Sequence, residues 1–396
     1  MSGRTGGRSE ALFSGYSGRI LLVLTSGELL ISIGALILPP LLPTITGDLG
    51  ITPSQAGAVM TVWWLAVALH NYPGGRLADR LSQKTILVAG SFIAIVGLVV
   101  LSTAFTYAVL LIGVAVLGIG RGLFQPAAIT QLSNLFVDRR GQALGIRNAA
   151  FTVGGTFAGG VAVVILALAD WRAAFVPIAV GLLTITGLVH VWNRQPYELR
   201  RVPLGIRDTG RRLTAVDELR WLVVALSVYG FAWNGATTFL PTYLQVSKGL
   251  PASTASIAFS GVFLVGAATQ PLAGLLGDRI GHLRSAAIAT VACSIGIGAL
   301  LLASNTVLVG GGLLVFGAGL AAFWPVVTAH GMGTLPDDSR GGDWGAITTV
   351  FIATESLGSA VAGFVAEQTS YDVAYAMLFV CFLSTAGIVG WLASDG

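Results

Sequence analysis

The chain has 396 residues, of which 54% are apolar and only 10% are Asp, Glu, Lys or Arg. Soluble domains carry about 25% charged residues, so this composition excludes an ordinary water-soluble globule. The formal net charge is +4. Because the basic residues lie in short runs between apolar segments, we expect no nucleic-acid partner. The composition predicts a polytopic helical protein whose main solvent is the lipid bilayer.

Twelve apolar segments are long enough to cross a bilayer, which takes about 20 residues of helix. The stretch that follows Arg19 is too long for the core of a signal peptide, so we expect it to form the first span. The predicted spans run over 19–44, 54–74, 85–105, 107–134, 142–168, 173–193, 221–245, 254–275, 284–304, 306–332, 344–366 and 372–393.

The distribution of Lys and Arg predicts the orientation, because positively charged loops stay in the cytoplasm. With both termini in the cytoplasm, the loops on the outer side keep only Arg172 and Lys248. We therefore expect a multi-pass protein of the plasma membrane. The basic residues assigned to cytoplasmic loops are Arg76, Arg80, Lys84, Arg139, Arg140, Arg147, Arg279, Arg284 and Arg340, together with those of segment 194–220.

The two halves of the chain repeat at a fixed spacing. Asp79-Arg80 recurs 199 residues later as Asp278-Arg279 (278 − 79 = 199). Matches at the same spacing are Gly118 with Gly317, Gly120 with Gly319 and Pro126 with Pro325, while Arg140-Gly141 recurs one place late as Arg340-Gly341. We therefore predict two six-helix units, at 1–193 and 221–396, joined by a basic cytoplasmic loop at 194–220. Copies with an even number of spans are parallel repeats, and we expect a cavity between them.

The loop after the second predicted span reads Gly75-Arg76-Leu77-Ala78-Asp79-Arg80-Leu81-Ser82-Gln83-Lys84, and its partner reads Gly274-Leu275-Leu276-Gly277-Asp278-Arg279-Ile280-Gly281-His282-Leu283-Arg284. The first loop resembles the G-x-L-A-D-R-x-G-R-K loop of the major facilitator superfamily, with Ser82 and Gln83 in place of the family's Gly and Arg. With the twelve spans and the turn Asp138-Arg139-Arg140-Gly141, the resemblance covers the whole chain. It implies an all-α membrane fold of two pseudo-symmetric six-helix bundles.

The resemblance also implies a cytoplasmic gate, in which Asp79 and Arg80 latch the two halves together and release them during transport. A carboxylate at a helix end accepts bonds from free amides, and nearby arginines pair with it when the halves close. The alternative is that the basic residues of these loops only anchor them in the cytoplasm. The residues expected in the gating loops are Gly75, Asp79, Arg80, Lys84, Gly274, Asp278, Arg279, Arg140 and Arg340.

A second resemblance concerns the fifth predicted span. Its segment Gly155-Thr156-Phe157-Ala158-Gly159-Gly160 is similar to the G-P-x-x-G-G motif of drug/proton antiporters, with Thr156 in place of the Pro. This similarity implies proton-driven export. The alternative is packing, because glycines at this spacing also let membrane helices approach closely.

Three charged side chains fall inside predicted spans, where a charge costs roughly 2.5 to 3.5 kcal/mol on insertion scales and therefore indicates function. We hypothesise that Glu28 pairs with Arg121 and couples proton movement to substrate, the alternative being a static ion pair. Many proton-coupled relatives carry an Arg at the place of Val114, so Arg121 cannot simply inherit its role. Glu355 either titrates or recognises a cationic substrate, and the sequence leaves both open.

Polar and aromatic side chains on the same central spans are candidates for a substrate pocket, namely Gln125, Trp233, Asn234 and Trp324. Each is also a candidate for packing or for an interfacial aromatic belt. No cluster of His, Cys or carboxylates has metal-ligand spacing, and no Gly-rich loop precedes a Lys as a phosphate cradle would. We therefore expect no metal, no cofactor and no catalytic residues.

These features favour a secondary transporter, in which two halves rock about a central site by alternating access. The expected partners are a small-molecule substrate, protons and the lipid bilayer, and we expect a monomer. Proton-driven export of a drug or metabolite competes with proton-linked uptake of a small polar metabolite. The other classes are a membrane-embedded enzyme, which would need a nucleophile with a base or a metal triad, and a non-transporting sensor on the same fold.

Overall fold

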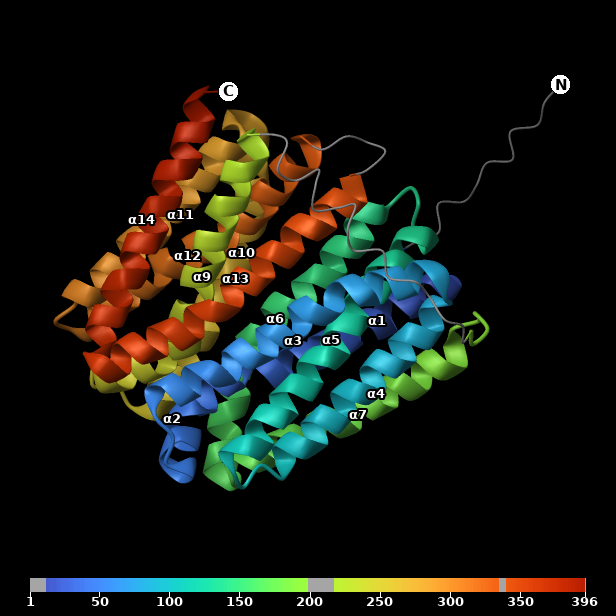
Figure 1. Cartoon of the computed structure of the whole chain (residues 1–396), viewed down its shortest axis with the longest axis horizontal. Coiled ribbons are helices and arrows are strands. Elements are labelled where there is room, and N and C mark those ends of the chain that lie inside the picture. Colours follow the sequence, from blue (N-terminus) through green and yellow to red (C-terminus); the bar gives the residue numbers. More distant parts are fainter. Residues whose placement is uncertain (1–11, 199–216, 335–339, 396) are drawn as a thin grey trace.

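The computed structural model describes residues 12–198, 217–334 and 340–395, with the backbone alone described at 217–219, 340–346 and 395. These residues form helices that assemble into two bundles (Figure 1). The first bundle contains α1 (Gly15–Leu36), α2 (Leu38–Leu49), α3 (Pro53–Arg80), α4 (Gln83–Ser102), α5 (Tyr107–Leu135), α6 (Arg140–Leu168), the 3-10 turn η1 (Trp171–Ala174) and α7 (Phe175–Trp192). The second contains α9 (Asp217–Val246), α10 (Ala252–Ile280), α11 (His282–Leu302), α12 (Thr306–Thr334), α13 (Arg340–Gln368) and α14 (Tyr371–Asp395).

Eleven helical segments of the described chain are long and apolar enough to span a membrane. The first of them, Gly15–Leu49, is broken at Ile37, because Pro39 and Pro40 follow and proline fits only the first turn of a helix. The twelfth span of the fold is α3, whose lower hydropathy follows from polar residues such as His70 and Arg76. The prediction of twelve spans in two six-helix bundles is therefore correct.

The repeat is visible in the backbone as well as in the sequence. Gly50 and Gly249, which are 199 residues apart, both have a left-handed φ, of 61° and 66°. At the next loop the two halves differ. Gly281 has φ 95°, whereas Ser82 has φ −66° and its hydroxyl accepts a hydrogen bond from the Thr85 amide at the start of α4. The departure of Ser82 from the family's Gly therefore provides a helix cap in the first half.

The two halves meet along two pairs of helices, α3 with α13 and α6 with α10. At the first contact a side chain on Gly57 would overlap the carbonyl oxygen of Ser359. At the second, a side chain on Gly159 would overlap the carbonyl oxygen of Ser256. These contacts are equivalent under the repeat, since 256 − 57 = 199 and 359 − 159 = 200. In each, a glycine of one half receives a serine backbone of the other, as close packing in membranes requires.

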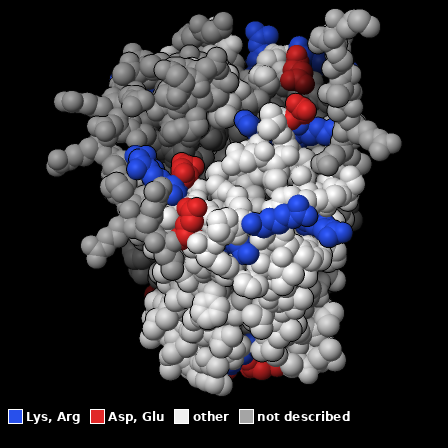
Figure 2. All heavy atoms as spheres, turned by 90° about the vertical axis from the view of Figure 1, so that its right-hand side faces the viewer, with Lys and Arg blue, Asp and Glu red and all other residues white. Residues whose placement is uncertain are grey.

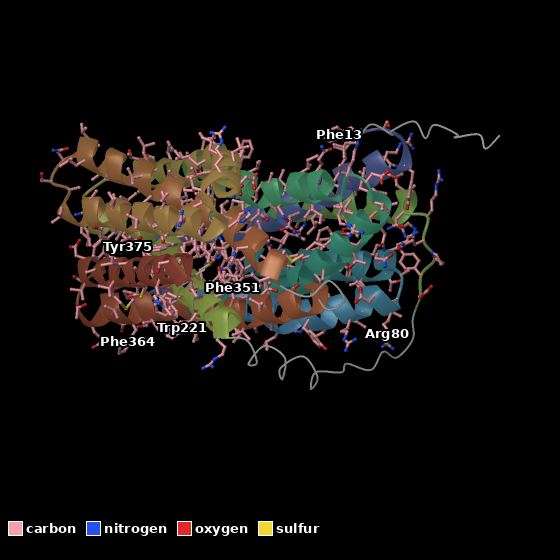
Figure 3. All side chains as sticks on the ribbon, turned by 90° about the horizontal axis from the view of Figure 1, so that it is seen from above. Phe13, Arg80, Trp221, Phe351, Phe364 and Tyr375 are labelled. Atoms are coloured by element: carbon pink, nitrogen blue, oxygen red, sulfur yellow. The ribbon has the colours of Figure 1, made fainter. Side chains whose placement is uncertain are left out.

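The ends of the two bundles differ in charge. We call the end where α3 finishes at Arg80 and α10 finishes near Arg279 the basic end, and the end where α3 and α10 begin the opposite end. Arg80 and Phe13 lie at the same end of the first bundle (Figure 3). Figure 2 faces that side and shows Lys and Arg side chains over its upper and middle part. Large apolar side chains are exposed along the spans, including Leu69, Phe92 and Leu168, as expected of a surface in lipid.

Candidate functional site

A buried ion-pair cluster lies inside the first bundle, where α1, α5 and α6 meet. The Glu28 carboxylate of α1 contacts two guanidinium groups, with Oε1 2.9 Å from Arg121 Nη2 and Oε2 2.6 Å from Arg147 Nη2. The exposed fractions of the three residues are 0%, 4% and 2%. Arg121 also donates to the Ser32 hydroxyl at 3.2 Å, and Arg147 to the Asn148 side-chain oxygen at 3.0 Å. We call Glu28, Arg121 and Arg147 the arginine cluster.

The arginine cluster carries more positive than negative charge. Two guanidinium groups face one carboxylate, which leaves a net charge of +1 on three buried side chains. The Nε atoms of Arg121 and Arg147 are buried and have no hydrogen-bond partner among the described residues. Buried donors are nearly always satisfied in native proteins, so these two indicate a site that is incomplete without an acceptor. The arrangement suits an anion, because guanidinium groups bind carboxylates and phosphates with two parallel hydrogen bonds.

The sequence-based assignment of Arg147 was wrong. It was counted among the cytoplasmic anchors, whereas the structure buries it two turns inside α6 against Glu28. A signal was present, because Arg147 falls inside the span predicted at 142–168, where a charge indicates function. The positive-inside rule counts residues near span ends and cannot separate an anchor from a buried residue one turn further in.

Aromatic rings border the arginine cluster. The Arg121 guanidinium carbon lies 4.9 Å from the ring centre of Phe151 and 5.6 Å from that of Trp63. Phe151 is 6.3 Å from Trp233 of α9, and Trp233 is 5.8 Å from Trp64 of α3. These rings therefore join the first half to the second directly beside Arg121. The structure thus brings Trp233 to the site, as expected for a pocket residue.

Glu355 approaches the same site from the second half. It lies on α13, is 2% exposed, and attracts the Arg121 guanidinium electrostatically across the interface. The backbone around it is tightly held, because the Asn234 amide donates to the Glu355 carbonyl at 2.8 Å. Gly230 also lets α9 approach closely, since a side chain there would meet Phe351 and the Glu355 Cβ. The three charged residues expected inside the membrane therefore lie around one region.

The remaining pocket candidates differ in what they contact. Gln125 is half-buried one turn along α5 from Arg121 and makes no hydrogen bond with the described residues. Trp324 packs at 4.9 Å against Phe351, one turn before Glu355. Asn234 is fully buried, and its side chain donates to α13 and accepts from Thr238 at 3.1 Å. Asn234 is therefore engaged in holding α9 against α13.

The gating-loop residues lie at the basic end. Asp79 is exposed and makes no hydrogen bond or ion pair with the described residues. Arg80, Arg140 and Arg279 are also exposed, at the ends of α3, α6 and α10. Lys84 binds within its own half, donating to the Asn193 carbonyl at 2.9 Å. Asp278 lies 3.6 Å from His282, and Gly75 and Gly274 have room for a side chain. The side chain of Arg340 lies outside the described residues.

The described hydrogen bonds that join the halves lie toward the opposite end. The Ser54 amide donates to Glu367 at 3.0 Å, and the Ala360 amide donates to the Thr61 hydroxyl at 3.2 Å. The Gly159 amide donates to the Ser260 hydroxyl at 2.9 Å. The glycine segment at 155–160 is thus part of this contact, with Gly155 against the ring of Phe263. Packing accounts for Gly155 and Gly159, whereas Gly160 is exposed and a side chain there would meet nothing within 4 Å.

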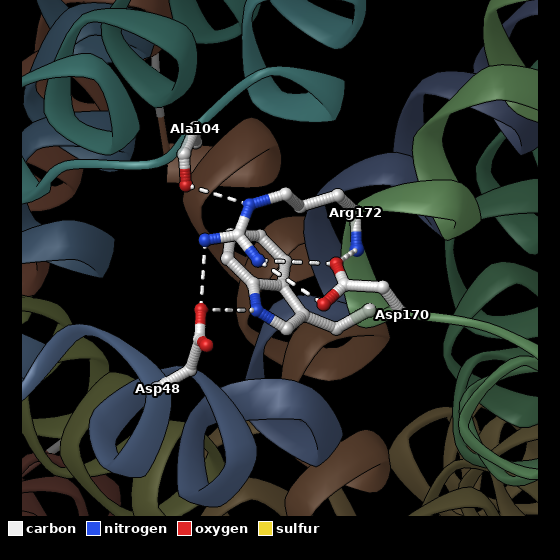
Figure 4. A network of polar contacts seen from close by, with 5 residues as sticks. Asp48, Ala104, Asp170 and Arg172 are labelled. Atoms are coloured by element: carbon white, nitrogen blue, oxygen red, sulfur yellow. Dashed lines mark hydrogen bonds and ion pairs between the residues drawn. The ribbon is translucent and has the colours of Figure 1, made fainter.

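A polar network closes the first bundle at the opposite end (Figure 4). Arg172 is 8% exposed and donates to Asp48 at 2.7 Å, to both oxygens of Asp170 at 3.1 Å and to the Ala104 carbonyl at 2.9 Å. The Trp171 indole donates to Asp48 at 3.2 Å. The end of α2, the loop before α5 and η1 are therefore tied together. Sequence analysis predicted Arg172 only as a residue of an outer loop.

We predict that Asp48→Asn destabilises the first bundle by about 1 to 3 kcal/mol, because it removes a charged acceptor shared by Arg172 and Trp171. Thermal unfolding of the detergent-solubilised protein measures the loss. The matched control is Asp138→Asn, at an exposed carboxylate without a hydrogen bond or ion pair to the described residues. Equal melting temperatures for the two variants would show that the network adds no stability.

The described residues contain no group of three or more His, Cys, Asp or Glu that could hold a metal ion.

A family model described as Major Facilitator Superfamily matches residues 24–350 and 222–395. The chain is 27% identical to a probable sulfoacetate transporter of Cupriavidus necator over 84% of each protein. It is 27% identical to a probable L-galactonate transporter of Escherichia coli over 59% of the chain and 56% of that protein. It is 24% identical to a hexuronate transporter of Bacillus subtilis over 83% and 82%.

Solved structures agree on the fold. A bacterial homolog of the human lysosomal transporter spinster, in an inward-facing and occupied conformation, superposes with a TM-score of 0.78, 17% identity and 96% coverage of both chains. A D-xylose–proton symporter superposes with a TM-score of 0.72 and 17% identity, covering 95% of this chain and 97% of that one.

Proposed function

Since the chain belongs to the major facilitator superfamily, we propose that it is a secondary active transporter that takes up a small organic anion together with protons by alternating access. The observation that supports an anionic substrate is the arginine cluster, where two buried guanidinium groups face one carboxylate. A net positive charge fixed at mid-membrane stabilises an anion there and repels a cation. Sulfoacetate, galactonate and hexuronate, named for three relatives, are all organic anions.

The arrangement of the halves supports an inward-facing state. The described hydrogen bonds between the halves lie toward the opposite end. The gating-loop carboxylate Asp79 is exposed at the basic end. By the positive-inside rule the basic end is cytoplasmic. A substrate therefore reaches the arginine cluster from the cytoplasm in this state, and closure of the gating loops gives the outward-facing state.

We propose uptake in place of export because the glycine segment that resembles the antiporter motif has a packing role. The segment Gly155–Gly160 was the feature that favoured export, and two of its glycines, Gly155 and Gly159, serve the contact between α6 and α10. A buried positive charge also disfavours lipophilic cations, the common substrates of multidrug exporters. Protons are the expected coupling ion, because two carboxylates, Glu28 and Glu355, are buried among the described spans.

Purified protein in liposomes with an imposed pH gradient tests the proposal. Sulfoacetate, L-galactonate, a hexuronate, a neutral sugar and a lipophilic cation are supplied in turn, and proton flux is followed with an internal pH dye. We expect proton movement with at least one organic anion and none with the sugar or the cation. Transport of the cation or the sugar, without any response to the anions, would refute the anion assignment.

We predict that Asp79→Asn lowers transport about tenfold and leaves anion binding unchanged, because the proposed latch stabilises the closed basic end by a coupling of order 1 to 3 kcal/mol. Transport is measured in liposomes, and probe accessibility of cysteines placed at the basic end reports the conformational shift. If neither transport nor accessibility changes, the loop residues only anchor the chain in the cytoplasm.

A further inference from the structure

We propose that Glu355 carries the coupled proton: it balances the net positive charge of the arginine cluster while the site is empty, and takes up a proton when the anionic substrate arrives. This inference rests on the proposed function and deepens it, since it assigns the coupling to one carboxylate. It also chooses between the two roles that the sequence leaves open for Glu355.

The position of Glu355 suits this role. It lies on α13 in the second half, whereas Glu28, Arg121 and Arg147 all belong to the first half. Its carboxylate is buried and makes no hydrogen bond or ion pair with the described residues. The peptide around it is fixed by the Asn234 amide, which binds its backbone and not its side chain. A carboxylate this buried is costly as an anion unless a cation or a proton compensates it.

Arg121 and Glu355 border the same stretch of α9. The Arg121 guanidinium lies 4.9 Å from Phe151, whose ring is 6.3 Å from Trp233, and a side chain on Gly230, one turn before Trp233, would meet the Glu355 Cβ. Arg121 attracts Glu355 electrostatically, and Tyr229 of α9 also interacts with it. Glu355 therefore faces one positive group, the Arg121 guanidinium, and one neutral phenol, that of Tyr229. The other titratable residues with described side chains on helices packed against α13 are His70, Tyr72, Arg76, Asp79 and Arg80 of α3, Arg220 and Tyr243 of α9, His330 of α12, and Tyr371, Asp372, Tyr375 and Cys381 of α14.

The charges then add up in both states. Without substrate, the arginine cluster at +1 and an ionised Glu355 at −1 sum to zero. A bound monoanion brings the sum to −1, and one proton taken up by the Glu355 carboxylate restores zero by forming the neutral acid. When the anion leaves on the other side of the membrane, the proton dissociates to water there and the carboxylate faces Arg121 again. One proton thus moves with each monoanion.

Glu28 is less suited to carry this proton. Both of its oxygens contact guanidinium groups, at 2.9 and 2.6 Å. Protonation would give up both contacts and leave two buried arginines facing each other without a counter-charge, which is costly. Glu28 therefore sets the geometry of the two arginines, and the proton goes to the carboxylate that has no such partners.

The repeat supports a role for Glu355 beyond packing. Under the 200-residue spacing of Arg140 and Arg340, the partner of Glu355 is Gly155 (355 − 155 = 200). Gly155 packs against Phe263 at the equivalent place in the first half. A side chain on Gly155 would overlap the Phe263 ring, so the first half has no room for an acid at this position. Glu355 is therefore specific to the second half and not part of the repeated scaffold.

The test compares wild type with Glu355→Gln, which mimics the protonated acid at nearly constant volume, in liposomes containing L-galactonate or a hexuronate, which are monoanions. A one-unit pH gradient should drive about tenfold accumulation by the wild type, the equilibrium value for one proton per monoanion. For Glu355→Gln we expect exchange of labelled for unlabelled anion at wild-type rate, but accumulation near onefold. Glu355→Asp should keep a measurable proton-driven accumulation.

The possible results distinguish a failure of the Glu355 assignment from a failure of the proposed function. Proton-driven accumulation that persists in Glu355→Gln would overturn the assignment of Glu355 and leave the proposed function intact. Loss of exchange in a Glu355→Gln protein that melts like wild type would also overturn it, since Glu355 would then bind substrate. A wild-type protein that moves none of sulfoacetate, L-galactonate and a hexuronate, or moves them without protons, would overturn the proposed function and this inference together.

Discussion

Substitution of Arg147 by Gln is expected to weaken anion binding by about 100-fold, equivalent to ~3 kcal/mol, while the protein still folds. The variant keeps the pair between Glu28 and Arg121, which lie 2.9 Å apart. It removes the second guanidinium and with it the net positive charge. Truncating one partner of a buried charged contact typically costs 2 to 5 kcal/mol of binding, and the remaining neutral pair is compatible with burial.

The measurement is direct binding of sulfoacetate or a hexuronate to the purified protein, with thermal unfolding as the check on folding. Arg147→Lys is the matched control, because it keeps the charge and loses the planar fork, and we expect an intermediate loss. Glu28→Gln should behave differently, since it leaves two buried arginines without a counter-charge and lowers the melting temperature. Wild-type affinity in Arg147→Gln would show that the arginine cluster is purely structural.

Substitution of Gly159 by Val is expected to abolish transport, by at least about 100-fold, and to open the opposite end of the molecule. The Gly159 backbone lies against the Ser256 carbonyl and donates to the Ser260 hydroxyl, so a side chain there forces α6 and α10 apart. The state described here then becomes inaccessible, and alternating access stops because one of its two states is lost.

Gly160→Val is the matched control, since Gly160 is exposed and a side chain there meets nothing within 4 Å. Transport is measured in liposomes, and cysteine labelling from the opposite end reports the opening. Gly57→Val should reproduce the effect at the equivalent contact with Ser359. Transport at the wild-type rate in Gly159→Val would contradict the view that this contact closes the opposite end.

Much of the fold could be predicted from the sequence. Membrane spans depend on a run of apolar residues, which is local, and the 199-residue repeat relates distant segments without any contact information. The break at Ile37 was missed because Pro39 and Pro40 lie in an otherwise continuous apolar stretch. The role of Ser82 as a helix cap was also missed, although Ser is a preferred N-cap residue, because the segment was interpreted only as a gating loop.

The site was predictable only in part. Sequence gives the depth of a charge along its span, so Glu28, Arg121 and Glu355 were singled out, and the pair between Glu28 and Arg121 was expected and is present. It does not give the direction in which a side chain points around the helix axis. For that reason Arg147 was assigned to a loop and Asn234 to the substrate, whereas the structure turns Arg147 onto Glu28 and Asn234 onto the α13 backbone.

The central claim is that a net positive charge buried in the first bundle, where two arginines face one carboxylate, selects an anion. The most direct measurement is thermal unfolding of the purified full chain with added sulfoacetate, L-galactonate and hexuronate, against a neutral sugar and a lipophilic cation at equal ionic strength. Binding to the folded state raises the melting temperature. The account predicts a concentration-dependent rise with at least one organic anion, absent in Arg147→Gln. A rise with the cation or the sugar, and with none of the anions, would contradict it.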